Sequence, residues 1–81
     1  MIVSFKYLGL PKKEFNSRVN SIEVDEDADL KTVLGEIIKQ YKISKEIFKG
    51  CNYMINNKRS NLDRRLKDGD YLLITKSLGG G

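Results

Sequence analysis

Hydrophobic and polar residues alternate at the start of the chain, which indicates a β-strand over residues 2–8. One side of this extended segment carries the side chains of Val3, Phe5 and Tyr7. Residues 9–13 contain glycine and proline, which interrupt regular structure and indicate a turn. A weaker alternation over residues 19–24 predicts a second strand but leaves its buried side open. Together these segments predict an N-terminal β-hairpin.

An apolar stripe with helical spacing follows the predicted hairpin. Its members recur at steps of three and four residues, and they are Leu30, Val33, Leu34, Ile37, Ile38 and Tyr41. Asp29 stands just before the stripe, where a carboxylate can accept hydrogen bonds from the free N–H groups of a helix start. We therefore predict a helix that begins after Asp29 and buries this stripe. Residues 44–49 predict one more short helical turn, which ends at Gly50.

A second hairpin is predicted shortly after this turn. Residues 53–56 favour a short strand. Asn56-Asn57 favours a tight turn because asparagine tolerates positive φ. Lys58-Arg59 follows as a brief return strand.

The rest of the chain leads to a last strand. Leu62 and Leu66 are expected to anchor a loop that crosses the core. Asp68-Gly69-Asp70 predicts a tight turn, and residues 71–75 form a strongly β-favouring run. We expect Leu72 and Ile74 to face the helix.

The predicted order of elements is strand, strand, helix, strand, short strand and strand. One helix can cover only one face of a sheet. We therefore predict an α+β fold: a mixed sheet of four to five strands, one main helix on one face, and an open second face. The first and last strands have the strongest β character, so we expect them to lie side by side at the centre.

Length and composition exclude several classes of protein. The 81 residues suit one domain, and no apolar run approaches the roughly 18 residues of a membrane span. The first residues lack the layout of a secretion signal. With one cysteine and no histidine, the chain is not expected to form an internal disulfide, hold a transition metal or build a histidine-based triad. We expect a cytoplasmic protein that does not catalyse a reaction by itself.

The charged residues are unevenly placed. Lysine and arginine exceed aspartate and glutamate, and the formal net charge is +4. Acidic residues gather between positions 23 and 29, and basic residues gather at Lys58, Arg59, Arg64, Arg65 and Lys67. Two solvated surfaces explain this pattern, and so does recognition of nucleic acid or of an acidic protein.

The chain ends in Gly79, Gly80 and Gly81. Such a run has no side chains to pack and is entropically costly to order, so a frayed end or a remnant of cloning is one interpretation. The other is functional. A partner enzyme with a narrow channel needs a slim segment to reach a terminal carboxylate, and glycine leaves the carbonyl open to attack from either side.

Several of these segments together resemble the MoaD/ThiS family of sulfur carriers. They are Asn56-Asn57-Lys58, Leu62-Asp63, Leu66-Lys67-Asp68-Gly69-Asp70, the apolar strand after them, and the terminal Gly80-Gly81. The resemblance implies the β-grasp fold of ubiquitin, with a domain over residues 1–76 and a flexible tail over residues 77–81. It also makes a remnant of cloning a poor explanation of the glycines, because such a remnant would not preserve the spacing.

The resemblance implies a carrier on which other enzymes act, or at most the small subunit of a synthase. A ubiquitin-activating-enzyme-like adenylyltransferase of the MoeB/ThiF type would use ATP and Mg²⁺ to adenylate the Gly81 carboxylate. A cysteine desulfurase or sulfurtransferase would then supply sulfur for a thiocarboxylate. An acceptor synthase would use that sulfur for molybdopterin, tungstopterin or the thiazole of thiamine. The chain itself is expected to bind no cofactor and no metal.

Partner recognition is expected on the open face of the sheet and at the root of the tail. Period-two alternation places Leu73 and Thr75 on the face opposite the helix. Leu78 is expected to anchor the tail just before the glycines. Cys51 is expected to be a small buried hydrophobic residue.

Two alternatives remain open at this stage. The first is a ubiquitin-like protein modifier that is conjugated through Gly81 to lysines, because the activation step is the same. The second is an RNA-binding module of the TGS kind, which would use the basic residues between 58 and 67 on phosphates. We expect no nucleic-acid and no membrane partner under the main hypothesis.

Overall fold

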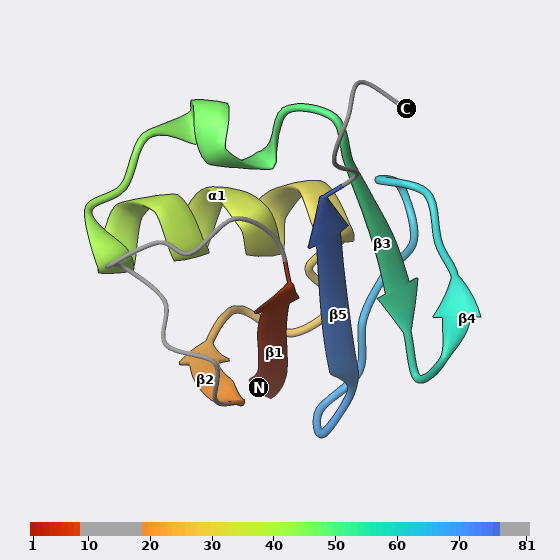
Figure 1. The fold of residues 1–81 in the computed structure, drawn as a ribbon. Coiled ribbons are helices and arrows are strands. Elements are labelled where there is room, and N and C mark those ends of the chain that lie inside the picture. Colours follow the sequence, from red (N-terminus) through yellow and green to blue (C-terminus); the bar gives the residue numbers. More distant parts are fainter. Residues whose placement is uncertain (9–18, 77–81) are drawn as a thin grey trace.

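The computed structural model describes residues 1–8 and 19–76. The predicted turn over residues 9–13 and the predicted tail over 77–81 lie outside these ranges. The elements, in chain order, are β1 (Ile2–Leu8), β2 (Asn20–Glu23), α1 (Leu30–Tyr41), the short 3₁₀ helix η1 (Lys45–Phe48), β3 (Cys51–Ile55), β4 (Lys58–Arg59) and β5 (Tyr71–Lys76). Figure 1 shows α1 lying across one side of the sheet.

The strands form one mixed sheet in the order β2-β1-β5-β3-β4. β1 pairs in parallel with β5, and the other neighbours are antiparallel. The antiparallel pairing of the first two strands and the adjacent, inner positions of the first and last strands are therefore confirmed. β5 lies between β1 and β3, so both of its edges are hydrogen-bonded (Figure 1).

The core lies between the sheet and α1. Every second residue of the central strands faces the helix, and the apolar stripe of α1 packs against them. Fully buried members are Val3, Phe5, Leu30, Val33, Ile37, Ile55, Leu72 and Ile74. Ile22 and Val24 are buried as well, which settles the facing of β2. The prediction that Leu72 and Ile74 face the helix is confirmed.

Four backbone N–H groups at the start of α1 all have partners. The Asp29 side chain accepts a 2.8 Å hydrogen bond from the N–H of Thr32, as predicted for an N-cap. The loop before β5 supplies two carbonyl groups: that of Arg64 accepts from the N–H of Leu30, and that of Leu62 accepts from the N–H of Lys31. The N–H of Val33 bonds to the carbonyl of Asp29. This helix start therefore has no free N–H group left for an anion.

The expected anchoring of this loop by two leucine side chains is half right. Leu66 is buried at 1% exposure, and its N–H donates to the carbonyl of Ala28. Leu62 is 43% exposed, so its side chain is not part of the core. Its contribution comes from the backbone carbonyl that accepts from the start of α1. The sequence therefore predicted correctly that Leu62 helps to attach the loop. The attachment is made by its backbone carbonyl, however, and not by its side chain.

Candidate functional site

The strand that leads to the predicted reactive end is the central strand of the sheet. β5 ends at Lys76, five residues before Gly81 in the sequence. Leu78, Gly79, Gly80 and Gly81 lie outside the described residues. What the structure defines is the platform from which this segment starts: a strand with hydrogen-bonded neighbours on both sides.

The start of β5 is held by a polar clamp between two turns. Asn56, at φ 52°, donates from its side-chain amide to the Asp70 carboxylate (2.9 Å) and accepts from the N–H of Tyr71 (2.9 Å). The second Asp70 oxygen accepts from the N–H of Lys67 (2.8 Å). These bonds join the β3–β4 turn to the turn before β5. Both predicted turns are thus confirmed.

The turn Asp68-Gly69-Asp70, which is part of the family resemblance, also has a structural role. Gly69 has φ 87°, a conformation that costs glycine little. Its N–H donates to the carbonyl of Ile2, and Asp68 accepts from the N–H of Ile2 at 2.7 Å. Asn56 and the turn Asp68-Gly69-Asp70, which are part of the family resemblance, therefore tie β1, β3 and β5 together at one end of the sheet.

Leu73 and Thr75 lie on the face of the sheet opposite α1, as predicted. Both are half-buried, whereas their neighbours Leu72 and Ile74 are at 0% exposure. The pairing register places Leu73 beside Lys6 of β1 and Met54 of β3. It places Thr75 beside Leu8 and Asn52. Sequence reasoning missed these neighbours, because alternation gives the face of a residue but not its cross-strand partners.

Cys51 lies next to the end of β5, directly opposite Lys76. It is half-buried against the core rather than fully buried, so the prediction holds only in part. Its thiol donates to the carbonyl of Ile47 at 3.5 Å. Burial raises the pKa of this thiol, although the Lys76 charge opposes the change. A protonated thiol is a poor nucleophile at neutral pH, so the surroundings of Cys51 do not favour sulfur transfer.

Tyr53 is the neighbouring titratable group on the same side of β3. Its hydroxyl donates to the carbonyl of Phe48 at 3.3 Å. Burial raises the pKa of Tyr53 to about 12, with a smaller contribution from Cys51. This phenol is therefore a neutral part of the packing between β3 and η1.

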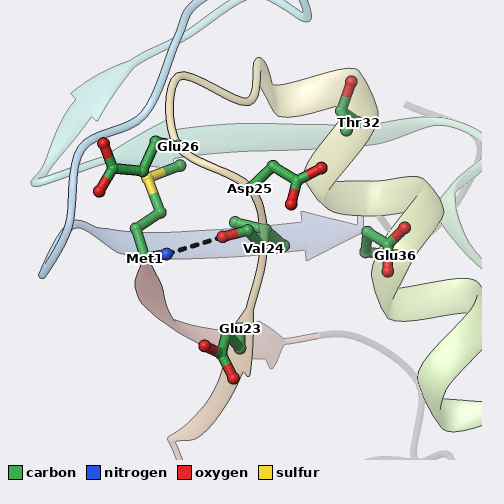
Figure 2. Close-up of a pocket in the computed structure, with 7 residues that line it drawn as sticks. All are labelled: Met1, Glu23, Val24, Asp25, Glu26, Thr32 and Glu36. Carbon is green, nitrogen blue, oxygen red and sulfur yellow. Dashed lines mark hydrogen bonds between the residues drawn. The ribbon is translucent and has the colours of Figure 1, made fainter.

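An acidic hollow lies beside the start of β1, at the other end of the sheet from Lys76. Its lining includes the carboxylates of Glu23, Asp25, Glu26 and Glu36. Figure 2 shows these carboxylates pointing in different directions, while the Met1 amino group donates to the carbonyl of Val24 at 2.7 Å. Within residues 1–8 and 19–76, no group of three or more acidic, histidine or cysteine side chains is arranged to hold a metal ion.

The basic residues between 58 and 67 are exposed but belong to different elements. Lys58 and Arg59 form β4 at the sheet edge. Arg64 and Arg65 lie in the loop beside the start of α1, where Arg65 forms an isolated bridge with Asp29. These basic residues are close in the sequence, but they do not lie together on one strand or one helix. The RNA-binding alternative stays a prediction that nothing here supports further.

No protein-family model matches the sequence, and no curated protein matches it either. Solved structures do match. The crystal structure of SAMP1 from Haloferax volcanii gives a TM-score of 0.80 at 18% identity over the whole of both chains. A putative molybdopterin converting factor, subunit 1, from Pyrococcus furiosus gives 0.68 at 23% identity over 95% of this chain and 98% of the other. A chain from the protein–protein complex of subunits 1 and 2 of molybdopterin-converting factor from Helicobacter pylori gives a TM-score of 0.60 at 24% identity over the whole of both chains.

These matches define the class of fold. The chain has the ubiquitin-like β-grasp fold, with a mixed five-stranded sheet and one main helix. Its structural neighbours include small proteins of the molybdopterin-converting-factor and SAMP1 types, so the fold implied by the resemblance is confirmed. In the described part of the chain, no helix has the length and apolar character to cross a membrane.

Proposed function

We propose that this protein is a sulfur carrier whose C-terminal glycine, Gly81, is adenylated by a partner enzyme and converted to a thiocarboxylate. The observation that carries the proposal is the position of β5. A central strand, hydrogen-bonded on both edges and clamped at its start, leads into a five-residue segment that ends in three glycines. The likeness to molybdopterin converting factor subunit 1 supports it.

The proposed chemistry needs only a carboxylate from this chain. A carboxylate is a poor electrophile until one oxygen becomes part of a good leaving group. Attack of the Gly81 carboxylate on the α-phosphate of ATP, with Mg²⁺ held by the partner, forms an acyl-adenylate and releases pyrophosphate. A persulfide from a cysteine desulfurase or sulfurtransferase then displaces AMP, and a second thiol cleaves the S–S bond to release the thiocarboxylate.

The domain would supply a rigid platform and a docking surface. Leu73 and Thr75 are proposed for partner contact, because they lie on the face that α1 leaves uncovered. Leu78, Gly79 and Gly80 are proposed for contact within the adenylating site, which must be narrow to select a segment without side chains. The acceptor would be a synthase of molybdopterin, tungstopterin or thiamine thiazole, and the location cytoplasmic.

The test is to express the chain with the adenylyltransferase and the sulfur donor of the same organism and to measure its intact mass. We expect the mass change of one oxygen replaced by sulfur. Deletion of Gly81 should abolish this change and leave the melting temperature unaltered, because the described core is built from residues between Val3 and Ile74. An unmodified mass with all partners present, ATP and a sulfur source would overturn the proposal.

A second candidate is conjugation of Gly81 to lysines of other proteins. The 0.80 TM-score to SAMP1 favours it, since a protein of this kind is also described as a small archaeal modifier protein. The same experiment separates the two functions. Conjugates that carry a Gly-Gly remnant on target lysines support the modifier, and a thiocarboxylate without conjugates supports the carrier.

A further inference from the structure

One aspartate of the chain is followed by glycine, and this pair, Asp68-Gly69, lies in the turn before β5. In any peptide, the side-chain carbonyl carbon of an aspartate can be reached by the amide nitrogen of the next residue. Attack at that carbon closes a five-membered succinimide ring. The side chain of the next residue obstructs the attack, and glycine has none. Asp68-Gly69 is therefore the aspartyl pair of this sequence with the least obstructed path to a succinimide.

The turn needs both of these residue types. Gly69 has φ 87°, a backbone conformation that residues with a side chain rarely adopt. A Cβ atom at this position would meet no atom within 4 Å, so the backbone angle and not a lack of space favours glycine. Asp68 supplies the carboxylate that accepts from the N–H of Ile2 at 2.7 Å. The residues that build the turn are thus the residues that can react with each other.

Ile2 of β1 holds both of the groups that would react. Its N–H donates to the Asp68 carboxylate, and its carbonyl accepts from the N–H of Gly69 at 2.8 Å. A backbone nitrogen has a single proton to donate, so the bond from Gly69 to Ile2 must break before this nitrogen can attack. Beyond the glycine, the carbonyl of Asp70 accepts from the N–H of Ser4 at 3.0 Å, so β1 holds the turn on both sides.

We propose that Asp68-Gly69 is a site of spontaneous aspartate isomerisation, and that the two hydrogen bonds to Ile2 suppress the reaction while the turn is closed. The Gly69 nitrogen forms a bond to the side-chain carbon of the neutral Asp68 acid. One carboxyl oxygen leaves as water, with its own proton and the amide proton. Water then opens the ring at either carbonyl, which restores aspartate or gives isoaspartate. This chemistry does not involve Gly81, so it is independent of the proposed function.

Isoaspartate at this position would change the fold. Its main chain runs through the former side chain and is one carbon longer, so the turn can no longer present the same two groups to Ile2. The tie between β1 and the start of β5 is then lost. Asp68 and Gly69 are both exposed, so water reaches them in the folded protein, and the hydrogen bonds are the obstacle. The rate of isomerisation should therefore follow the fraction of molecules in which the turn is open.

The test incubates the purified chain at one temperature and pH in a series of guanidinium chloride concentrations, from none to complete unfolding. Peptide mapping with electron-transfer fragmentation measures isoaspartate at residue 68. An isoaspartyl-specific methyltransferase with labelled S-adenosylmethionine measures the total. Asp70 is the internal control, because it belongs to the same turn but is followed by Tyr71, whose side chain obstructs ring closure.

We expect isomerisation at residue 68 to be about tenfold or more faster in the unfolded chain than in the native one, in step with the fraction unfolded. Asp70 should form much less isoaspartate. After removal of the denaturant, isomerised chains should melt at a lower temperature than unaltered ones. Equal rates in native and unfolded chains would overturn the protective role of Ile2. Unfolded chains without isoaspartate at residue 68, or isomerised chains with an unaltered melting temperature, would also contradict the proposal.

Asp68→Asn gives an independent measurement of the same protection. The side-chain amide keeps an oxygen that can accept from Ile2, and it reaches the same succinimide with release of ammonia. Conversion of the amide to a carboxylate is recorded by mass, and peptide mapping assigns it to residue 68. We expect the same preference, about tenfold or more, for the unfolded chain. A folded variant that loses its amide as fast as the unfolded one would refute the protection. If the variant does not fold, the denaturant series on the unaltered chain decides alone.

Discussion

The two faces of the sheet differ along a single strand. In β5, Leu72 and Ile74 are at 0% exposure beneath α1, whereas Leu73 and Thr75 are half-buried on the other side. The first pair belongs to a core shared with β1, β3 and the helix. The second belongs to a mixed surface with Lys6, Met54 and Arg59. Neighbouring leucines in the sequence thus lie in different surroundings, Leu72 in the core and Leu73 on the face that is proposed for partner contact.

Leu72→Ala is the strongest test of the buried side. Loss of the Leu72 side chain leaves a cavity between the sheet and α1, so we expect the free energy of unfolding to fall by about 2–5 kcal/mol. For a domain of this size that loss is a large part of the total stability. Urea unfolding followed by circular dichroism measures it. A loss below 1 kcal/mol would contradict the claim that the core depends on this face.

Asn56→Ala tests the clamp at the start of β5. The change removes two side-chain hydrogen bonds, to Asp70 and to the N–H of Tyr71, and places alanine at positive φ. We expect a loss of about 1–3 kcal/mol. Asn57→Ala is the matched control, because Asn57 has φ 67° in the same turn without these two bonds. Equal losses for the two variants would show that the clamp contributes nothing beyond turn strain.

Leu73→Ala tests the open side against Leu72→Ala. The side chain is half-buried and outside the core, so we expect unfolding to change by less than about 1 kcal/mol. Affinity for the adenylyltransferase should fall by about tenfold, because a central apolar contact is lost. The two readouts are urea unfolding and calorimetry. The comparison fails if Leu73→Ala destabilises the fold as much as Leu72→Ala does.

The smallest expected effect concerns Tyr53 and alkaline pH. Because burial raises its pKa from 10.0 to about 12, folding favours the neutral phenol. Its contribution to stability is complete below pH 10 and is lost as pH rises from 10 toward 12. The ultraviolet titration curve of the unaltered chain, minus that of the Tyr53→Phe variant, reports the ionisation of the Tyr53 phenol. A midpoint near 10 in the difference curve would show that the phenol is exposed in the folded protein.

Local features of the sequence were enough to predict which elements form, although β3 spans Cys51–Ile55 rather than the predicted residues 53–56. Asp29 before an apolar stripe gave the start of α1, and Asn56-Asn57 and Asp68-Gly69-Asp70 gave both turns, because capping and positive φ depend on residues close in the chain. The prediction was wrong for the Leu62 side chain. A leucine in a loop has no periodic pattern to show which way it points, and here its backbone carbonyl makes the contact.

The sequence by itself determined the α+β class, the helix with its cap, the alternation that puts Leu73 opposite Leu72, and the glycines at the end. These follow from propensities and periods that act over a few residues. Tertiary structure decided the register, which brings Lys6, Leu73, Met54 and Arg59 into one row from four strands, and the distribution of the basic residues over separate elements. Cross-strand neighbours are set by the packing of the whole core against α1, and no local pattern contains that information.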